Sequence, residues 1–382
     1  MIYLDYSATT PVDARVLEAM TPFFSASFGN PSSVHRYGQV AESAVESARE
    51  TVASILNCRS DEIIFTSCGS ESDNLAIRGA AYAMRERTGA KWILASRAEH
   101  PALTNTLKHL EKYEGFLIEW LDVNENGMVK LETVEKSVCD NTAIISVMYA
   151  NNEIGTINPI KEIAGICRAN NVLFHTDAVQ AAAYLPVDVN DLNVDMMSLG
   201  AHKFYGPKGV GALYVRSGTP LVSQLTGGGQ EFNLRAGTLN VPYIVGFAEA
   251  LRLTNEERDQ RVAHVKPLRD KIIGTVLETI PDSRLTGDME SRLPHHASFV
   301  FKGVDGNLLL TLLDAASFAC SSGSACKTGN PEPSEVMNAI GLSREWGLGS
   351  LRVTLGIHTT PADIDSFLNV LPGLVEKARR LK

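Results

Sequence analysis

Residues 143–177 read AIISVMYANNEIGTINPIKEIAGICRANNVLFHTD, two short apolar runs separated by a longer segment with helical spacing. Runs of this length that are rich in Ile, Val and Phe are typical of buried strands. We therefore predict strands at 143–149 and 172–175 with a helix between them. The same alternation extends to both sides, with further strands expected at 62–66, 92–95, 116–121, 194–199 and 212–215. Strands and helices in alternation predict a mostly parallel central sheet, flanked by helices on both faces.

Polar residues follow directly after five of these expected strands. In α/β sheets of this kind, ligands bind beyond the carboxyl ends of the strands. The polar segments are residues 67–71, 96–100, 151–153, 177–180 and 201–203. The sequence therefore predicts that five strand ends converge on one pocket.

A smaller α+β unit is expected after the charged stretch 255–261, which we predict opens a helix running to about residue 280. The expected division is a large α/β domain over 15–255 and a small domain made of 1–14 and 256–382. In the small domain, strands are predicted at 297–301 and 351–357, and helices at 307–316 and from 362. Residues 321–334 (SSGSACKTGNPEPS) are rich in Gly, Ser and Pro, which is typical of an exposed, mobile loop.

Composition excludes several classes of protein. Of the 382 residues, 44% are hydrophobic and 21% charged, as in ordinary globular proteins. The net charge of −9 disfavours a broad surface for direct nucleic-acid binding. The six cysteines contain no C-x-x-C pair, so we predict no metal site and a reducing compartment. Without a basic leader or a long apolar run, the chain is expected to be cytoplasmic with no membrane anchor.

Three features suggest a cofactor when they are taken together. Gly69 and Ser70 lie between a strand and a helix, where amide groups and the helix dipole can hold a phosphate. Asp177 ends a buried strand, where a carboxylate needs a cation such as a protonated ring nitrogen. Lys203 follows an apolar strand and could form a Schiff base. Taken alone, each has an ordinary explanation: a serine N-cap, a structural ion pair and a solvated lysine. Their combination is what pyridoxal phosphate requires.

Ordered motifs along the whole chain then resemble a known family. The chain is similar to the NifS-like pyridoxal-phosphate cysteine desulfurases, within the class V aminotransferase branch of fold type I. The motifs are YLDYSATTP (3–11), FGNP (28–31), FTS (65–67), ESDNL (71–75), NNEIG (151–155), HK (202–203), RAGT (235–238), SSGSAC (321–326) and SLR (350–352).

The resemblance implies how pyridoxal 5′-phosphate would be held. Lys203 would carry it covalently, Asp177 would face the pyridine nitrogen and His100 would stack on the ring. For the phosphate, the implied contacts are Gly69, Ser70, His202 and, across a homodimer interface, Thr238. For the phenolic oxygen, they are Gln180 and Asn152.

The resemblance also implies the reaction, the conversion of L-cysteine to L-alanine. Arg352, with Asn152 beside it, would bind the substrate carboxylate through its planar fork. Lys203 and His100 would move protons, and Cys326 would attack the substrate sulfur as a thiolate and carry it as a persulfide. A sulfur-acceptor protein would receive it. That acceptor could be an iron–sulfur scaffold, a tRNA-thiolation relay or a DNA sulfur-modification system.

Two alternatives share most of these residues. An aminotransferase or a selenocysteine lyase would have the same lysine, aspartate and phosphate site, and only the Cys326 loop separates them. A non-catalytic scaffold would have no need for Lys203, Asp177 and His100 together. The chain also departs from many relatives at Gly200, where a serine hydroxyl is expected near the phosphate. It further ends without the longer tail by which some relatives dock an iron–sulfur scaffold.

Overall fold

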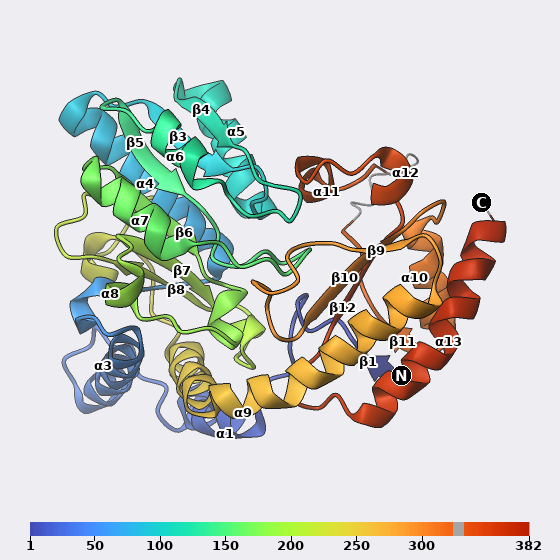
Figure 1. Ribbon diagram of the computed structural model, residues 1–382. Helices are drawn as coiled ribbons and strands as arrows, with labels where there is room; N and C mark the ends of the chain where they lie inside the picture. The colour runs from blue at the N-terminus through green and yellow to red at the C-terminus, as the bar shows by residue number, and fades with distance from the viewer. Residues whose placement is uncertain (324–331, 382) are drawn as a thin grey trace.

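The computed structural model describes residues 1–323 and 332–381, and its centre is a seven-stranded sheet (Figure 1). The strand order is β2-β8-β7-β6-β5-β3-β4, and all neighbours are parallel except where β8 pairs with β2 and β7. The strands are β2 Ile63–Thr66, β3 Trp92–Ser96, β4 Leu117–Leu121, β5 Thr142–Ser146, β6 Leu173–Asp177, β7 Met196–Gly200 and β8 Gly211–Val215. The expected mostly parallel α/β sheet is confirmed.

Side chains alternate between the two faces of this sheet and build a core on each. On β2, Ile63 and Phe65 belong to one core and Ile64 to the other. The Ile64 core includes Leu75 of α4 and Leu107 of α5, whereas α3, α7 and α9 cover the opposite face. The helices around the sheet are α1 Ala14–Met20, α2 Pro22–Ser25, α3 Arg36–Leu56, α4 Gly69–Thr88, α5 Pro101–Glu114, α6 Leu131–Ser137, α7 Ile160–Ala169 and α8 Val189–Leu192.

A three-stranded antiparallel sheet, in the order β12-β10-β9, lies on the other side of the molecule (Figure 1). Beside it, the N-terminal strand β1 (Ile2–Tyr3) pairs in parallel with β11 (Phe318–Ala319). The remaining elements here are β9 Ser283–Leu285, β10 His296–Phe301, β12 Ser350–Thr354, α10 Gly306–Ala315, α11 Glu335–Ala339, α12 Arg344–Gly347 and α13 Pro361–Arg380. None of the helices in residues 1–323 and 332–381 is long and apolar enough to cross a membrane.

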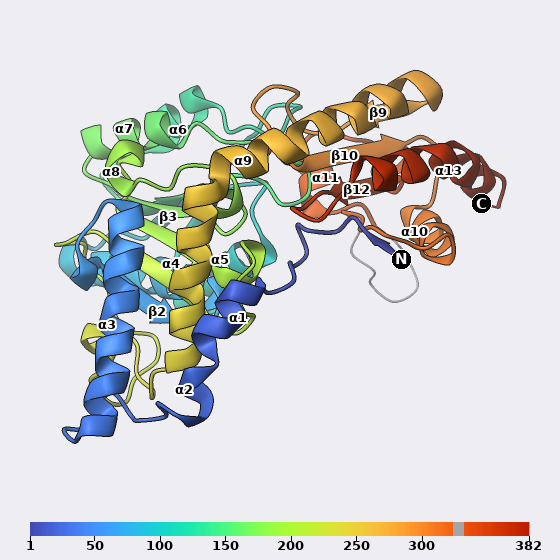
Figure 2. The same cartoon turned by 90° about the horizontal axis from the view of Figure 1, so that it is seen from below.

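One long helix, α9 (Val241–Thr279), runs from the large sheet to the three-stranded sheet (Figures 1 and 2). The expected start of this helix at residue 255 is wrong. Val241, Ile244, Phe247 and Leu251 are buried at helical spacing, so the helix forms earlier and continues through the charged stretch 255–261. Since this helix crosses the expected boundary, the division at residues 255/256 stays a prediction.

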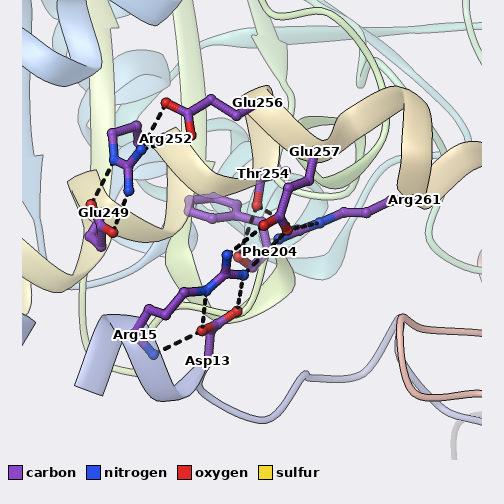
Figure 3. A network of polar contacts seen from close by, with 9 residues as sticks. All are labelled: Asp13, Arg15, Phe204, Glu249, Arg252, Thr254, Glu256, Glu257 and Arg261. Atoms are coloured by element: carbon purple, nitrogen blue, oxygen red, sulfur yellow. Dashed lines mark hydrogen bonds and ion pairs between the residues drawn. The ribbon is translucent and has the colours of Figure 1, made fainter. Parts of the chain in front are cut away.

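A polar network fixes the middle of α9 to the start of the chain and to the segment after β7 (Figure 3). Arg15 bonds Asp13 and Glu257, and Glu257 also accepts from Arg261 at 2.9 Å. Arg261 is buried and donates to Thr254 Oγ1 (2.8 Å), whose hydroxyl donates to the carbonyl of Phe204 (3.2 Å). Phe204 directly follows Lys203, so this network helps to hold the lysine in place. Nearby on the same helix, Arg252 pairs with Glu249 and Glu256.

Candidate active site

A cavity of about 390 Å³ lies at the carboxyl ends of the central strands. It is lined from one chain by nearly all the residues that the sequence predicted for the cofactor and the substrate carboxylate. These are Gly69, Ser70, His100, Asn152, Asp177, Gln180, His202, Lys203 and Arg352. The expected convergence of strand ends is therefore confirmed.

The cavity meets the start of α4, which is suited to an anion. Cys68 is the N-cap and gives no side-chain hydrogen bond, and Gly69 and Ser70 are the first two residues of the helix. The alternative of a serine N-cap is therefore wrong. The N–H groups of a first helical turn have no partner within the helix, and the dipole there favours negative charge. Both residues line the cavity, so a phosphate can bind at this end.

Two buried carboxyl groups, Asp177 and Asp73, line the cavity. Asp177, at the end of β6, accepts from the N–H of Val179 at 2.8 Å, and no cationic side chain in the described part of the chain pairs with it. Burial raises its pKa, against the opposing effect of His100. Asp73 of α4 has an Oδ1 without a hydrogen-bond partner among the described residues. Burial, with Asp177 nearby, raises the pKa of Asp73 well above its usual range. A cation placed here would relieve both costs.

Lys203 follows β7 in a short 3-10 turn and is prepared to act as a nucleophile. Its Nζ donates to the carbonyls of Ser7 (2.5 Å) and Ala8 (2.8 Å). Burial and the neighbouring Arg352 lower its pKa to about 8. A much larger fraction of the amine is therefore uncharged near neutral pH than for an exposed lysine, and the uncharged amine is the form that attacks a carbonyl.

Two histidines, His100 and His202, line the cavity together with Lys203. His100 caps α5, and its Nδ1 accepts from the N–H of Ala102 at 3.1 Å, which leaves Nε2 to carry the proton. Burial lowers the pKa of His100, so the ring is neutral at pH 7. Burial also lowers the pKa of His202 to about 4, and its Nδ1 contacts Thr9 Oγ1 at 3.2 Å. Both rings can therefore donate a hydrogen bond without adding charge.

Arg352 of β12 enters the cavity from the three-stranded sheet. Its Nη1 donates to the carbonyl of Asn152 (3.0 Å) and its Nη2 to Asp5 Oδ1 (2.9 Å). Its buried Nε has no partner among the described residues. A guanidinium has five N–H donors, so this side chain retains donors for an incoming carboxylate.

Two of the predicted site residues are not in this cavity. Thr238 is exposed and lines a separate cavity with Arg235, whose side chain pairs with Glu71 of α4 at 2.8 Å. Its expected contact comes from a partner subunit, so it stays a prediction. Cys326 lies outside the described residues, and so does most of the loop expected at 321–334.

Sequence reasoning missed the residues that hold Lys203 and Arg352. Ser7 and Ala8 had no assigned role, although Ser7 O also accepts from Gln180 Nε2 at 2.8 Å. Asp5 likewise had none. Asp73 could have been found, because it lies one helical turn after Gly69 and Ser70 and so shares their face of α4.

Known proteins show which family this chain belongs to. Residues 2–367 match the model of the family described as aminotransferase class-V. The chain belongs to this family. It is 45% identical to the cysteine desulfurase IscS of Clostridium botulinum over all of this chain and 96% of that protein. It is also similar to a solved NifS-like protein (TM-score 0.91, 36% identity, 98% of this chain and 99% of that chain). A structure described as SspA in complex with cysteine has a TM-score of 0.81 and 35% identity, covering 94% and 100% of the two chains.

Pyridoxal 5′-phosphate is the cofactor of this family, and the cavity fits it. The uncapped start of α4 suits the phosphate, the unpaired Asp177 suits a protonated ring nitrogen, and the amine of Lys203 suits the aldehyde carbon. When bound, the cofactor supplies a sink for the electrons of a broken bond at the substrate Cα. The residues expected for this cofactor in one chain are thus brought together.

We expect Gly200→Ser to tighten cofactor binding. A Cβ at Gly200 would lie 3.4 Å from Val179 Cγ1 and 3.5 Å from the N atom of Gly69, so a serine fits beside the phosphate end. A hydrogen bond to a charged group contributes about 1.5 kcal/mol, which corresponds to about tenfold in affinity. Titrating cofactor-free protein with pyridoxal 5′-phosphate measures the dissociation constant. Gly200→Ala is the matched control, and equal affinities of the Ser and Ala variants would contradict the expectation.

Proposed function

We propose that this protein is a cysteine desulfurase that converts L-cysteine to L-alanine, holds the sulfur on Cys326 and passes it to an acceptor protein. The observation that carries this proposal is the pairing of Arg352 with Ser321. Arg352 N donates to Ser321 O at 2.7 Å, and Ser321 N donates to Arg352 O at 3.3 Å. The segment that carries Cys326 therefore begins beside the arginine proposed for the substrate carboxylate. The relatives named cysteine desulfurase and the neighbour described with cysteine support the same substrate.

The chain's own groups account for the proton movements. Arg352 would bind the carboxylate of L-cysteine and thereby orient its Cα toward Lys203. The neutral amine of Lys203 would take the Cα proton, and His100 Nε2 would exchange a proton near the substrate sulfur. The Cys326 thiolate would then form a bond to that sulfur as the substrate Cβ–S bond breaks. The electron pair of that bond stays on the carbon, which is protonated on the way to alanine.

The direct test is to incubate the purified protein with L-cysteine and a reductant and to measure alanine and sulfide. We expect equal amounts of the two products. An aminotransferase would instead form the keto acid of its amino donor and would stop after one turnover without an acceptor. A scaffold would give neither product, and its purified form would lack the visible absorbance of the cofactor.

A homodimer would complete the phosphate site through Thr238. Exposed aromatic residues support such an interface: Phe28 packs on Tyr37 (ring centroids 5.5 Å), and Phe232, half exposed, lies under Arg49. We expect sedimentation to give a dimer of the 41.4 kDa chain, and Thr238→Ala to stay dimeric but bind the cofactor several-fold more weakly. A monomer, or unchanged cofactor affinity in Thr238→Ala, would contradict this interface.

We also propose a cytoplasmic location. The five described cysteines are all free thiols, which fits a reducing compartment. The acceptor is proposed as a protein with a reactive thiol, because exchange of a persulfide requires one. The three acceptor systems considered above remain the candidates.

A further inference from the structure

The turn at 151–155 connects the cavity to the three-stranded sheet. Asn151 is buried and holds this turn rigid: its Oδ1 accepts from the N–H groups of Glu153 (2.8 Å) and Ile154 (3.0 Å). The next residue, Asn152, lines the cavity, and its carbonyl accepts from Arg352 (3.0 Å) and contacts His296 Nε2 (3.2 Å). The position of Glu153 is thus fixed relative to the cavity.

The side chain of Glu153 lies beside residues from both ends of the segment that carries Cys326. Its Oε2 accepts from the hydroxyl of Ser334 at 2.5 Å. A Cβ atom added to Gly323 would lie 2.6 Å from this same oxygen and 3.5 Å from Ser334 Oγ. Gly323 and Ser334 therefore lie side by side, with the Glu153 carboxyl against both.

Each of the two ends is also tied to a second element. Gly323 N donates to Ser350 Oγ at 3.1 Å, next to Arg352 in β12. Ser334 is buried and is the N-cap of α11, where its Oγ accepts from the N–H of Met337 at 3.2 Å. The hydroxyl of Ser334 thus has both a donor and an acceptor, and Glu153 is its only acceptor among the described residues.

We propose that Glu153 is a positioning residue for sulfur transfer: it bonds Ser334 at one end of the Cys326 segment, lies against Gly323 at the other end, and connects both to the turn that carries Asn152. This inference rests on the proposed role of Cys326. Fixing the two ends of a connecting segment limits the volume that a group between them can reach, and so raises the effective concentration of that group. Misplacement of a reacting group by about 1 Å can lower a rate about 100-fold.

The charge on Glu153 makes this contact sensitive to pH. Burial raises the pKa of Glu153 to about 7, against the opposing effects of the Ser334 hydrogen bond and of Arg352, and Glu335 raises it further. The ionised carboxylate accepts the stronger, charge-assisted hydrogen bond from Ser334. The contact should therefore strengthen as the pH rises through about 7.

The test measures alanine formation from L-cysteine by holoenzyme variants of Glu153. We expect Glu153→Ala to lower kcat about 10- to 100-fold, with unchanged cofactor absorbance and an unchanged spectral response to L-cysteine. Ser334→Ala should show a similar loss, and the double variant should be no worse than Glu153→Ala alone, because both act through one contact. Glu345→Ala, on an exposed carboxylate of α12, is the matched control and should retain full activity.

Glu153→Gln preserves the side-chain volume and an acceptor oxygen, and it is the variant to measure if Glu153→Ala does not fold. The ratio of the wild-type rate to the Glu153→Gln rate should rise with pH through about 7, and a purely structural role would leave that ratio flat. An unchanged kcat, additive losses with Ser334→Ala, or an altered spectral response to L-cysteine would overturn the proposal.

A second readout does not depend on desulfuration. The rate at which Cys326 is alkylated, measured by mass spectrometry, should change in Glu153→Ala. Alanine formation by Cys326→Ala would instead refute the proposed nucleophile.

Discussion

Lys203→Ala should abolish alanine formation from L-cysteine, with a loss of at least about 10³-fold. The substitution removes both the amine that holds the cofactor and the base for the Cα proton, and general acid–base catalysis alone contributes about 10²- to 10⁴-fold. The structure gives this lysine the properties of a base, because burial and Arg352 lower its pKa to about 8. Alanine is measured by chromatography after incubation with saturating pyridoxal 5′-phosphate and L-cysteine.

Lys208→Ala is the matched control, since Lys208 lies five positions later in the chain and is exposed. It should bind the cofactor and turn over normally. If Lys203→Ala retained the absorbance of covalently bound cofactor, another lysine would hold it and the site would be wrongly assigned.

Cys326→Ala should bind the cofactor and respond spectrally to L-cysteine, yet form alanine at least about 10³-fold more slowly. The residues proposed to contact the cofactor do not include Cys326, whereas the sulfur needs a thiolate to receive it. Three of the other cysteines are poorly suited to replace it. Burial raises the pKa values of Cys58 and Cys167 to about 12 and also raises that of Cys320, which favours the unreactive thiol in each.

Cys139→Ala provides the control on an exposed thiol. Its alanine formation should match the wild type. Normal alanine formation by Cys326→Ala would show that sulfur leaves without this nucleophile.

Much of the cavity could be predicted because its residues lie at the ends of strands with clear apolar patterns. Asp177 ends β6 and Lys203 lies in the turn after β7, so their convergence requires only that these strands be parallel. The same local reasoning places Gly69 and Ser70 at the start of α4. This local reasoning fails at α9. The charged stretch 255–261 resembles a domain boundary, although the buried face of the helix continues through it.

The groups that orient Lys203 and Arg352 could not be predicted in this way. Ser7 and Ala8 act through backbone carbonyls, which carry no side-chain signal. They reach the cavity because β1 pairs with β11 and Asp5 pairs with Thr354, contacts between distant parts of the chain. Glu153 is similar: its partner Ser334 is far along the sequence, and nothing in the local pattern links the two.

The most direct test of the account is to find the transferred sulfur. The wild-type holoenzyme is mixed with one equivalent of L-cysteine, thiols are blocked at once, and the peptide that contains Cys326 is analysed by mass spectrometry. We predict the mass of one added sulfur atom on Cys326, matched by an equal amount of alanine. Alanine formed with no added sulfur on this peptide, or sulfur found on another cysteine, would contradict the account.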